Sequence, residues 1–215
     1  GGAQHANKLP NLYEYKFQRL FGYKPISDFD ATRGTVAIPR VLNMYEDYPF
    51  WFTFFTELKF RVVLSPPSSK AIYEMGMETI ASDTACYPAK LVHGHIKWLV
   101  DNGEQWIFYP CLNYERNEDP SAPNHYNCPI VATYPEVIKN NMDDLFQDNL
   151  VRFSQPFLPY DNDLRLADVL TKDLKPNHIS KEEIMRAVSK ARKEQIRFKN
   201  DIKKQGEYAL KYARS

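Results

Sequence analysis

Short apolar runs rich in β-branched and aromatic residues recur along the chain, and stretches of helical character separate them. The clearest runs are Thr35–Pro39, Phe60–Ser65 and Trp106–Pro110. Most of their side chains are apolar on successive positions, which is typical of strands buried on both faces of a sheet. Strands of this kind that alternate with helices form parallel sheets between helical layers. The sequence therefore predicts an α/β fold with an open, mostly parallel sheet, flanking helices and a C-terminal helical segment.

The remaining elements follow from the same periodicity argument. Two further strands are predicted at Met77–Ala81 and Pro129–Pro135, and a sixth could form within residues 151–158. Ser82 or Asp83 is expected to cap the helix that follows the first of these two strands. Helices are predicted over Leu12–Phe21, Met44–Leu58 with Pro49 in its first turn, Lys70–Gly76, Cys86–Asn102, and from Pro135 to about Met142.

The chain divides into three regions. Residues 1–32 are expected to form an N-terminal extension or linker, residues 33–160 the α/β domain, and residues 161–215 the C-terminal helical segment. Ser180 and Glu183 form a capping-box pattern that opens a long helix. The apolar stripe of this helix, which Gln195 interrupts, consists of Ile184, Val188, Ala191, Phe198 and Ile202.

Charge is distributed unevenly along the chain. The formal net charge is only +1, but eleven basic and five acidic side chains fall within residues 181–215. This basic helix could contact phosphate or an acidic partner, although a solvated face is the commoner arrangement. The near-neutral total gives no reason to expect a nucleic-acid partner. Because no run of about eighteen apolar residues occurs, no membrane span is predicted.

Three cysteines in 215 residues are too few, and odd in number, for a secreted disulfide scaffold. The first ten residues lack the apolar stretch of a signal peptide, so a reducing cytoplasm is the expected compartment. The Gly1-Gly2 start resembles an expression-tag scar, so function could depend on parts of a longer parent protein. Hydrophobic residues make up 43% of the chain, which is enough for one packed core.

Motifs of common nucleotide-binding and hydrolytic sites are missing from the sequence. It contains neither of the phosphate-binding patterns GxxxxGK[ST] and GxGxxG, nor the hydrolase patterns GxSxG and HExxH. No nucleotide is therefore predicted for this chain.

The three cysteines occupy positions at which thiols can take part in chemistry. Cys86 opens a predicted helix, where the helix dipole and free backbone N–H groups favour a thiolate. Cys111 stands at the carboxyl end of the next strand, the edge at which parallel sheets bind ligands. Cys128 precedes a predicted strand and would lie at the opposite edge unless the preceding loop folds back. The gaps of 25 and 17 residues leave two interpretations open, a metal or cluster site and structural thiols.

Polar residues accompany the thiols. Lys90 and His93 fall on the same face of the predicted helix as Cys86, a set that could bind a cluster, an acyl thioester or an anion. A satisfied histidine inside a helix is the commoner case. The loop before Cys128 also gathers polar side chains, and loops of this length are often functional, though a purely structural loop stays an alternative. These loop residues are Glu115, Asn124, His125, Tyr126 and Asn127.

Four segments of the sequence, taken together, resemble those of a known protein family. They are IPRVLNMYEDYPFWFTFFTEL, SDTACYPAKLVHGH, IFYPC and NHYNCPIVATYPEVIKNN. They resemble a domain of large proteins that are described as activators of 2-hydroxyacyl-CoA dehydratase, and the likeness covers nearly all of residues 9–212. The resemblance implies a Rossmann-like or flavodoxin-like sheet and a relationship to the dehydratase subunits themselves. It also implies ATPase modules in the parent protein, whose ATP hydrolysis does not transfer to this chain.

The dehydratase-like subunits bind an iron–sulfur cluster through three cysteines, so the resemblance implies this cofactor. One family ligand lies in a Cys-x-x-x-Lys setting at a strand-to-helix junction, like Cys86 and Lys90. A second ends the following strand, like Cys111. The third comes from a later domain, and Cys128 does not clearly replace it. The cluster could therefore be absent from this chain even where the parent protein holds one.

Three functional hypotheses follow. In the first, Cys86 and Cys111, with Cys128 as a further candidate ligand, contribute to an iron–sulfur site for electron transfer to, or dehydration of, an acyl-CoA substrate. In the second, the domain is a non-catalytic module that docks the ATPase modules onto a dehydratase subunit. In the third, Cys86 is a nucleophile and His93 or His125 is its base. The candidate cofactor-binding residues beside the thiols are Lys90, His93, Asn124 and His125.

Overall fold

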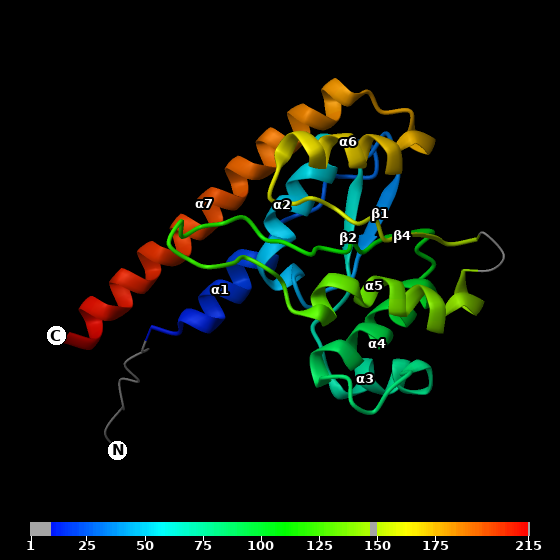
Figure 1. Ribbon diagram of the computed structural model, residues 1–215, viewed down its shortest axis with the longest axis horizontal. Helices are drawn as coiled ribbons and strands as arrows, with labels where there is room; N and C mark the ends of the chain where they lie inside the picture. The colour runs from blue at the N-terminus through cyan, green and yellow to red at the C-terminus, as the bar shows by residue number, and fades with distance from the viewer. Residues whose placement is uncertain (1–9, 147–149, 215) are drawn as a thin grey trace, which may run out of the picture.

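In a computed structural model that describes residues 10–146 and 150–214, the chain folds around a four-stranded sheet (Figure 1). Every strand pairs in parallel with its neighbours. The predicted α/β fold with an open parallel sheet is therefore confirmed. In spatial order the strands are β2 (Arg61–Leu64), β1 (Thr35–Ile38), β3 (Trp106–Phe108) and β4 (Arg152–Ser154).

The two central strands are the most deeply buried. Val36, Ala37 and Ile38 of β1 are fully buried. Ala37 pairs with Ile107 of β3, and Ile107 pairs in turn with Phe153 of β4. The edge strands β2 and β4 are only partly buried. Because β1 and β3 have a strand on each side and helices over the sheet, their side chains are apolar at successive positions.

Two groups of helices lie on opposite sides of the sheet (Figure 1). We call one group the aromatic layer, which consists of α1 (Leu12–Phe21), α2 (Met44–Glu57), α6 (Asp163–Asp173) and α7 (Lys181–Arg214). We call the other the thiol layer, which consists of α3 (Lys70–Gly76), α4 (Tyr87–Asp101) and α5 (Pro129–Asn141). Three 3-10 helices accompany them: η1 (Met77–Thr79), η2 (Asp143–Leu145) and η3 (Lys175–Asn177).

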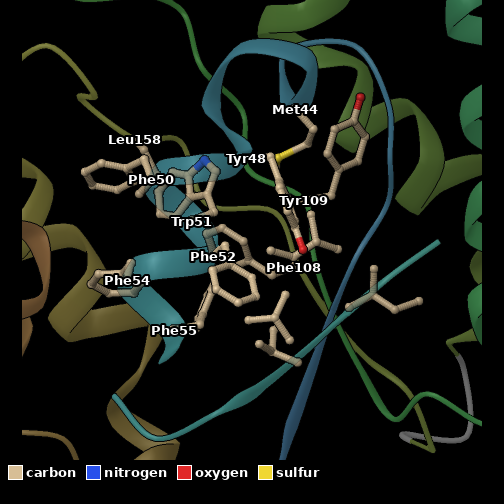
Figure 2. Packing of buried hydrophobic residues seen from close by; sticks show 14 of the residues in the cluster. Met44, Tyr48, Phe50, Trp51, Phe52, Phe54, Phe55, Phe108, Tyr109 and Leu158 are labelled. Atoms are coloured by element: carbon tan, nitrogen blue, oxygen red, sulfur yellow. The ribbon is translucent and has the colours of Figure 1, made fainter. Parts of the chain in front are cut away.

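Helix α2 joins the aromatic layer to the sheet (Figure 2). Trp51 and Phe55 are fully buried, and the centroid of each ring lies 4.9 Å from that of Phe108 on β3. Tilted and edge-to-face contacts of this kind add to the free energy of area burial. Pro49 is the sixth residue of α2, so the prediction that it lies in the first turn is wrong. The ring packing holds the helix together across the proline, which removes one backbone hydrogen bond.

The long helix α7 begins at the predicted capping box. The Ser180 hydroxyl accepts from the Glu183 N–H at 3.2 Å, and the Glu183 carboxylate accepts from the Ser180 N–H at 3.1 Å. Gln195, which interrupts the apolar stripe, is buried and donates to the Glu46 carbonyl of α2 at 2.7 Å. Among the described residues, neither α7 nor any other helix is long and apolar enough to cross a membrane. The stripe packs as predicted: Ile184, Val188, Ala191 and Phe198 are buried, and Ile202 is partly buried.

The predicted N-terminal extension is described from residue 10 onward, and residues 1–9 lie outside the described residues. Within it, α1 packs against both α2 and α7. Arg19 on α1 forms ion pairs with Glu194 and Asp201 on α7 at 2.8 and 2.9 Å. This helix is therefore part of the aromatic layer.

Two segments that were predicted as strands are helical. Met77–Thr79 is a 3-10 helix without a buried residue, so it contributes nothing to the interior of the sheet. Pro129–Asn141 is the helix α5, in which the Thr133 hydroxyl donates to the Pro129 carbonyl at 2.9 Å. A short apolar run does not distinguish a strand from a buried helix, and the proline at its start suits a first helical turn. Both strand predictions are therefore wrong.

Helices α3 and α4 approach each other closely at two glycines. A Cβ on Gly94 would lie 1.7 Å from the carbonyl oxygen of Ile72, and one on Gly76 would lie 2.2 Å from the Gly94 nitrogen. Side chains would therefore push the two helices apart, and the glycines fix α4 against α3.

Candidate thiol site

Cys86 lies at the N-terminus of α4, as the sequence predicts. It is exposed, it is the N-cap residue, and Pro88 follows in the first turn of the helix. The predicted caps Ser82 and Asp83 are wrong, because they precede this position in a turn where the Ser82 hydroxyl accepts from the Thr84 N–H at 3.2 Å. An extended backbone at Cys86 thus presents its thiol directly before the helix.

Cys128 repeats this arrangement on α5. It is also exposed and also the N-cap residue, and its backbone angles, φ −63° and ψ 152°, equal those of Cys86. The Val131 N–H donates to its sulfur at 3.5 Å. The loop before it folds back, because Tyr114 and Tyr126 form an antiparallel bridge. Since a helix follows Cys128 rather than the predicted strand, the expected position at the opposite sheet edge does not arise.

Cys111 differs from the other two thiols because it is buried. Its backbone extends the sheet beyond β3 and pairs with Phe157, and its N–H donates to the Pro156 carbonyl at 3.0 Å. Burial raises the pKa of the Cys111 thiol to about 12, and the Glu136 carboxylate adds to this rise. In this structure Cys111 therefore holds its proton at neutral pH.

Two buried tyrosines lie within electrostatic range of the thiols. Burial raises the pKa of Tyr109 well above its ordinary value, and Cys111, Tyr134 and Cys128 contribute to the same shift. Burial also raises the pKa of Tyr134, with a contribution from Cys86. The Tyr109 hydroxyl is buried and finds no hydrogen-bond partner among the described residues. Tyr109 and Tyr134 are therefore close enough to the thiols to share their electrostatic environment. The sequence analysis did not single out either tyrosine, although Tyr109 stands two residues before Cys111.

His93 is a buried link between helices. Its Nδ1 lies 2.8 Å from the Thr79 hydroxyl, and its Nε2 lies 3.0 Å from the Tyr134 hydroxyl. Because the Thr79 hydroxyl donates to the Gly76 carbonyl, Nδ1 carries the proton and Tyr134 donates to Nε2. Burial lowers the pKa of His93 to about 4. The ring is thus uncharged at neutral pH, and both of its nitrogens are occupied.

The other predicted cofactor-binding residues lie in two places. Lys90 donates to the Asp83 carbonyl at 2.8 Å and so holds the turn that leads to Cys86. Asn124 and His125 line a separate cavity beside α2. The structure therefore brings Lys90 and His93 to the helix of Cys86, and it places Asn124 and His125 around another hollow.

The thiols offer part of a metal-binding set. Thiolates are the ligands that iron–sulfur clusters and zinc prefer. Among the described residues, however, no three His, Cys, Asp or Glu side chains lie together in a way that could hold a metal ion. The described part of the chain thus does not form a closed metal site, and a site that includes these thiols needs further ligands.

These features define a class of protein, a parallel α/β domain that carries one thiol beyond the carboxyl end of a strand and two thiols at the beginnings of helices. The chain belongs to the family described as CoA enzyme activase uncharacterised domain, whose profile matches residues 35–215. The match begins at the first residue of β1. No curated protein and no solved structure matches the chain. The resemblance to activase-related proteins is therefore confirmed at the level of the family.

Proposed function

We propose that this domain contributes Cys86 and Cys111, with Cys128 as a further candidate ligand, to an iron–sulfur site in an activase-family protein. The site is completed by ligands from another part of that protein or from a subunit. It serves low-potential electron transfer to, or dehydration of, a CoA-linked substrate. The observation that carries the proposal is the placement of Cys86 directly before α4 and of Cys111 just beyond the carboxyl end of β3, in a chain that belongs to an activase family.

Residues of this chain beside the cysteines are suited to hold an iron–sulfur cluster. A bound iron–sulfur cluster would supply one-electron chemistry, and hydrogen bonds to its sulfur ligands would tune its potential. The Val131 N–H already donates to the Cys128 sulfur. Lys90 braces the turn before Cys86. The buried Tyr109 hydroxyl, unpaired among the described residues, is a donor beside the same thiols.

Anaerobic reconstitution with iron and sulfide, followed by electron paramagnetic resonance of the reduced protein, tests the proposal. The longer parent protein is expected to give a cluster signal that is lost in the double variant Cys86→Ala/Cys111→Ala. Ser82→Ala, in the turn beside Cys86, is the matched control and should keep the signal. Absence of a cluster in the parent protein, or an unchanged signal in the double variant, would contradict the proposal.

A docking module without catalysis is the second candidate, and two observations favour it. Cys111 is buried with a raised pKa, which is typical of a structural thiol. Large side chains are also exposed at the outer ends of α1 and α7, among them Tyr13, Tyr208 and Leu210. These surfaces suit contact with the ATPase modules or with a dehydratase subunit.

Thiol titration of the native chain separates the two candidates. A site with accessible ligands predicts fast modification of Cys86 and Cys128 and slow modification of Cys111. A module with structural cysteines predicts that all three thiols resist modification until the protein unfolds, and the exposure of Cys86 and Cys128 argues against that outcome. Mass spectrometry of the modified peptides assigns each rate to one cysteine.

A further inference from the structure

A polar cavity of about 560 Å³ lies between the start of α2, the loop of residues 113–127 and α7. The loop passes beside α7 in Figure 1, where Lys199 of α7 forms an ion pair with Glu118 of the loop. Asn43, Asp47 and Glu115 are among the lining residues. The cavity is large enough for a small molecule, and none of the hypotheses about the thiols accounts for it.

Asn43 is the first unusual group in this cavity. Its side chain is only 7% exposed, and neither its amide oxygen nor its amide nitrogen has a hydrogen-bond partner among the described residues. Although Asn43 precedes α2, its backbone is helical and its side chain does not cap the helix. Burial of an unpaired amide is unfavourable. A ligand in the cavity would supply the missing partner.

Asp47 and Glu115 form the second unusual feature. Asp47 is 1% exposed, and one of its carboxyl oxygens has no partner among the described residues. Glu115 accepts from the Asn127 amide at 2.9 Å. Burial raises the pKa of both carboxyls, and each lies close enough to affect the titration of the other. Two adjacent buried carboxyl groups are unfavourable when both are charged.

The other acidic residues of the cavity differ from this pair. Three of them have partners: Glu46 pairs with Lys16, Glu118 pairs with Lys199, and Asp119 accepts from the Ser121 hydroxyl at 2.7 Å. Within residues 10–146 and 150–214, no lysine or arginine side chain forms an ion pair with Asp47 or Glu115. The carboxylates at the rim thus have direct partners, whereas Asp47 and Glu115 have no ion pair within these ranges. Lys199, and for Glu115 also Arg192, lowers the pKa of these carboxyls without pairing with them.

We propose that this cavity binds a small organic cation through an ammonium or guanidinium group that contacts Asp47, Glu115 and the Asn43 oxygen. Such a group brings several N–H donors, which match the carboxylate and amide acceptors. It also supplies the direct ion pair that Asp47 and Glu115 lack among the described residues. A metal ion is a poorer match, because no three metal-ligating side chains come together among the described residues.

Calorimetric titration with n-butylguanidine and with its neutral isostere n-butylurea tests this proposal on the whole chain. The guanidine is expected to bind at least about tenfold more tightly than the urea, because only the cation forms charge-assisted hydrogen bonds. Asp47→Asn should weaken guanidine binding at least about tenfold. Asp119→Asn, at the rim and partnered by Ser121, is the matched control and should leave the affinity within about twofold.

Thermal unfolding separates a loss of binding from a loss of folding. Without ligand, Asp47→Asn should not lower the melting temperature, because a neutral amide is easier to bury than a carboxylate. If it does, Glu115→Gln replaces it as the test variant. Equal binding of the two probes, or full guanidine binding in a folded Asp47→Asn or Glu115→Gln protein, overturns the proposal. The variant Cys86→Ala/Cys111→Ala should bind guanidine normally, so the iron–sulfur proposal can fail independently.

Discussion

The aromatic layer and the thiol layer cover the same sheet with different chemistry. In the aromatic layer, α2 buries Phe50, Trp51, Phe54 and Phe55, which pack through ring contacts. The Trp51 indole N–H has no hydrogen-bond partner among the described residues. In the thiol layer, α4 buries His93 and His95 beside Val92 and Ile96, and both histidine rings hydrogen-bond to residues from other elements.

This difference assigns different tasks to the two layers. Ring packing is tolerant of small shifts and supplies a large free energy through buried area. Buried hydrogen bonds contribute less but require defined partners and directions. The aromatic layer therefore stabilises the fold through buried ring area, whereas hydrogen bonds in the thiol layer fix His93 against Thr79 and Tyr134.

Truncation of the central aromatic residue should have the largest effect. Trp51→Ala removes a fully buried ring that contacts Phe108 and Tyr160, and it should lower the free energy of unfolding by about 3–5 kcal/mol. Trp98→Ala, on a half-buried position of α4, is the matched control in the thiol layer. Urea unfolding measures both. An equal loss in the two variants would show that the layers do not differ in this way.

The close contact of α3 and α4 predicts the next effect. Gly94→Ala places a methyl group against the backbone of Ile72, and the overpacking should lower the free energy of unfolding by about 1–3 kcal/mol. Gly206→Ala, on α7 where nothing lies within 4 Å, should instead raise it by about 0.5–1 kcal/mol. Thermal or urea unfolding measures both variants. A lower free energy of unfolding for Gly94→Ala with a higher one for Gly206→Ala confirms the close approach of α3 and α4, and an unchanged free energy for Gly94→Ala argues against it.

The buried histidines make the thiol layer sensitive to acid. Burial lowers the pKa of His93 and of His95 from 6.5 to about 4. Between these pH values the unfolded chain binds more protons than the folded one, so stability is complete above pH 6.5 and is lost as the pH falls toward 4. Each histidine contributes a slope of up to about 1.4 kcal/mol per pH unit.

The comparison with a variant isolates this effect. Asp47 and Glu115 have raised folded pKa values, so their contribution has the opposite sign and is lost as the pH rises. The double variant His93→Gln/His95→Gln leaves that contribution unchanged. Its unfolding free energy should therefore fall less steeply than that of the wild type between pH 6.5 and 4. Parallel pH profiles would refute the assignment of the acid sensitivity to these rings.

The smallest expected effect concerns helix caps. Ser180→Ala removes the hydroxyl that accepts from the Glu183 N–H at the start of α7, which should cost about 1 kcal/mol of unfolding free energy. Ser82→Ala is the natural comparison, because Ser82 was predicted as a cap of α4 and lies in a turn before it. It should change the unfolding free energy by less than about 0.5 kcal/mol. A larger loss of unfolding free energy for Ser82→Ala than for Ser180→Ala would contradict the assignment of Ser180, and not Ser82, as a helix cap.

Much of the fold could be predicted from the sequence, and the wrong strand predictions have a common cause. The predicted bounds of α1 and α3 match the structure. Those of α2 differ from it by one residue at the C-terminal end, and those of α4 by one residue at each end. The error at Pro129–Pro135 arose because a short apolar run suits a strand and a helix equally. Placement of Cys86 before a helix was correct, since the prolines and periodicity around it are local signals.

The local pattern of apolar, capping and turn residues by itself determined the alternation of strands and helices, the parallel sheet and the long C-terminal helix. Backbone sterics and side-chain periodicity act over a few residues, so they are visible in the sequence. Only the tertiary structure decided that Tyr109 and Tyr134 come within electrostatic range of the thiols, and that Asn43, Asp47 and Glu115 meet in one cavity. Each of these sets combines residues from segments that are distant in the chain, and the packing of whole layers brings the segments together.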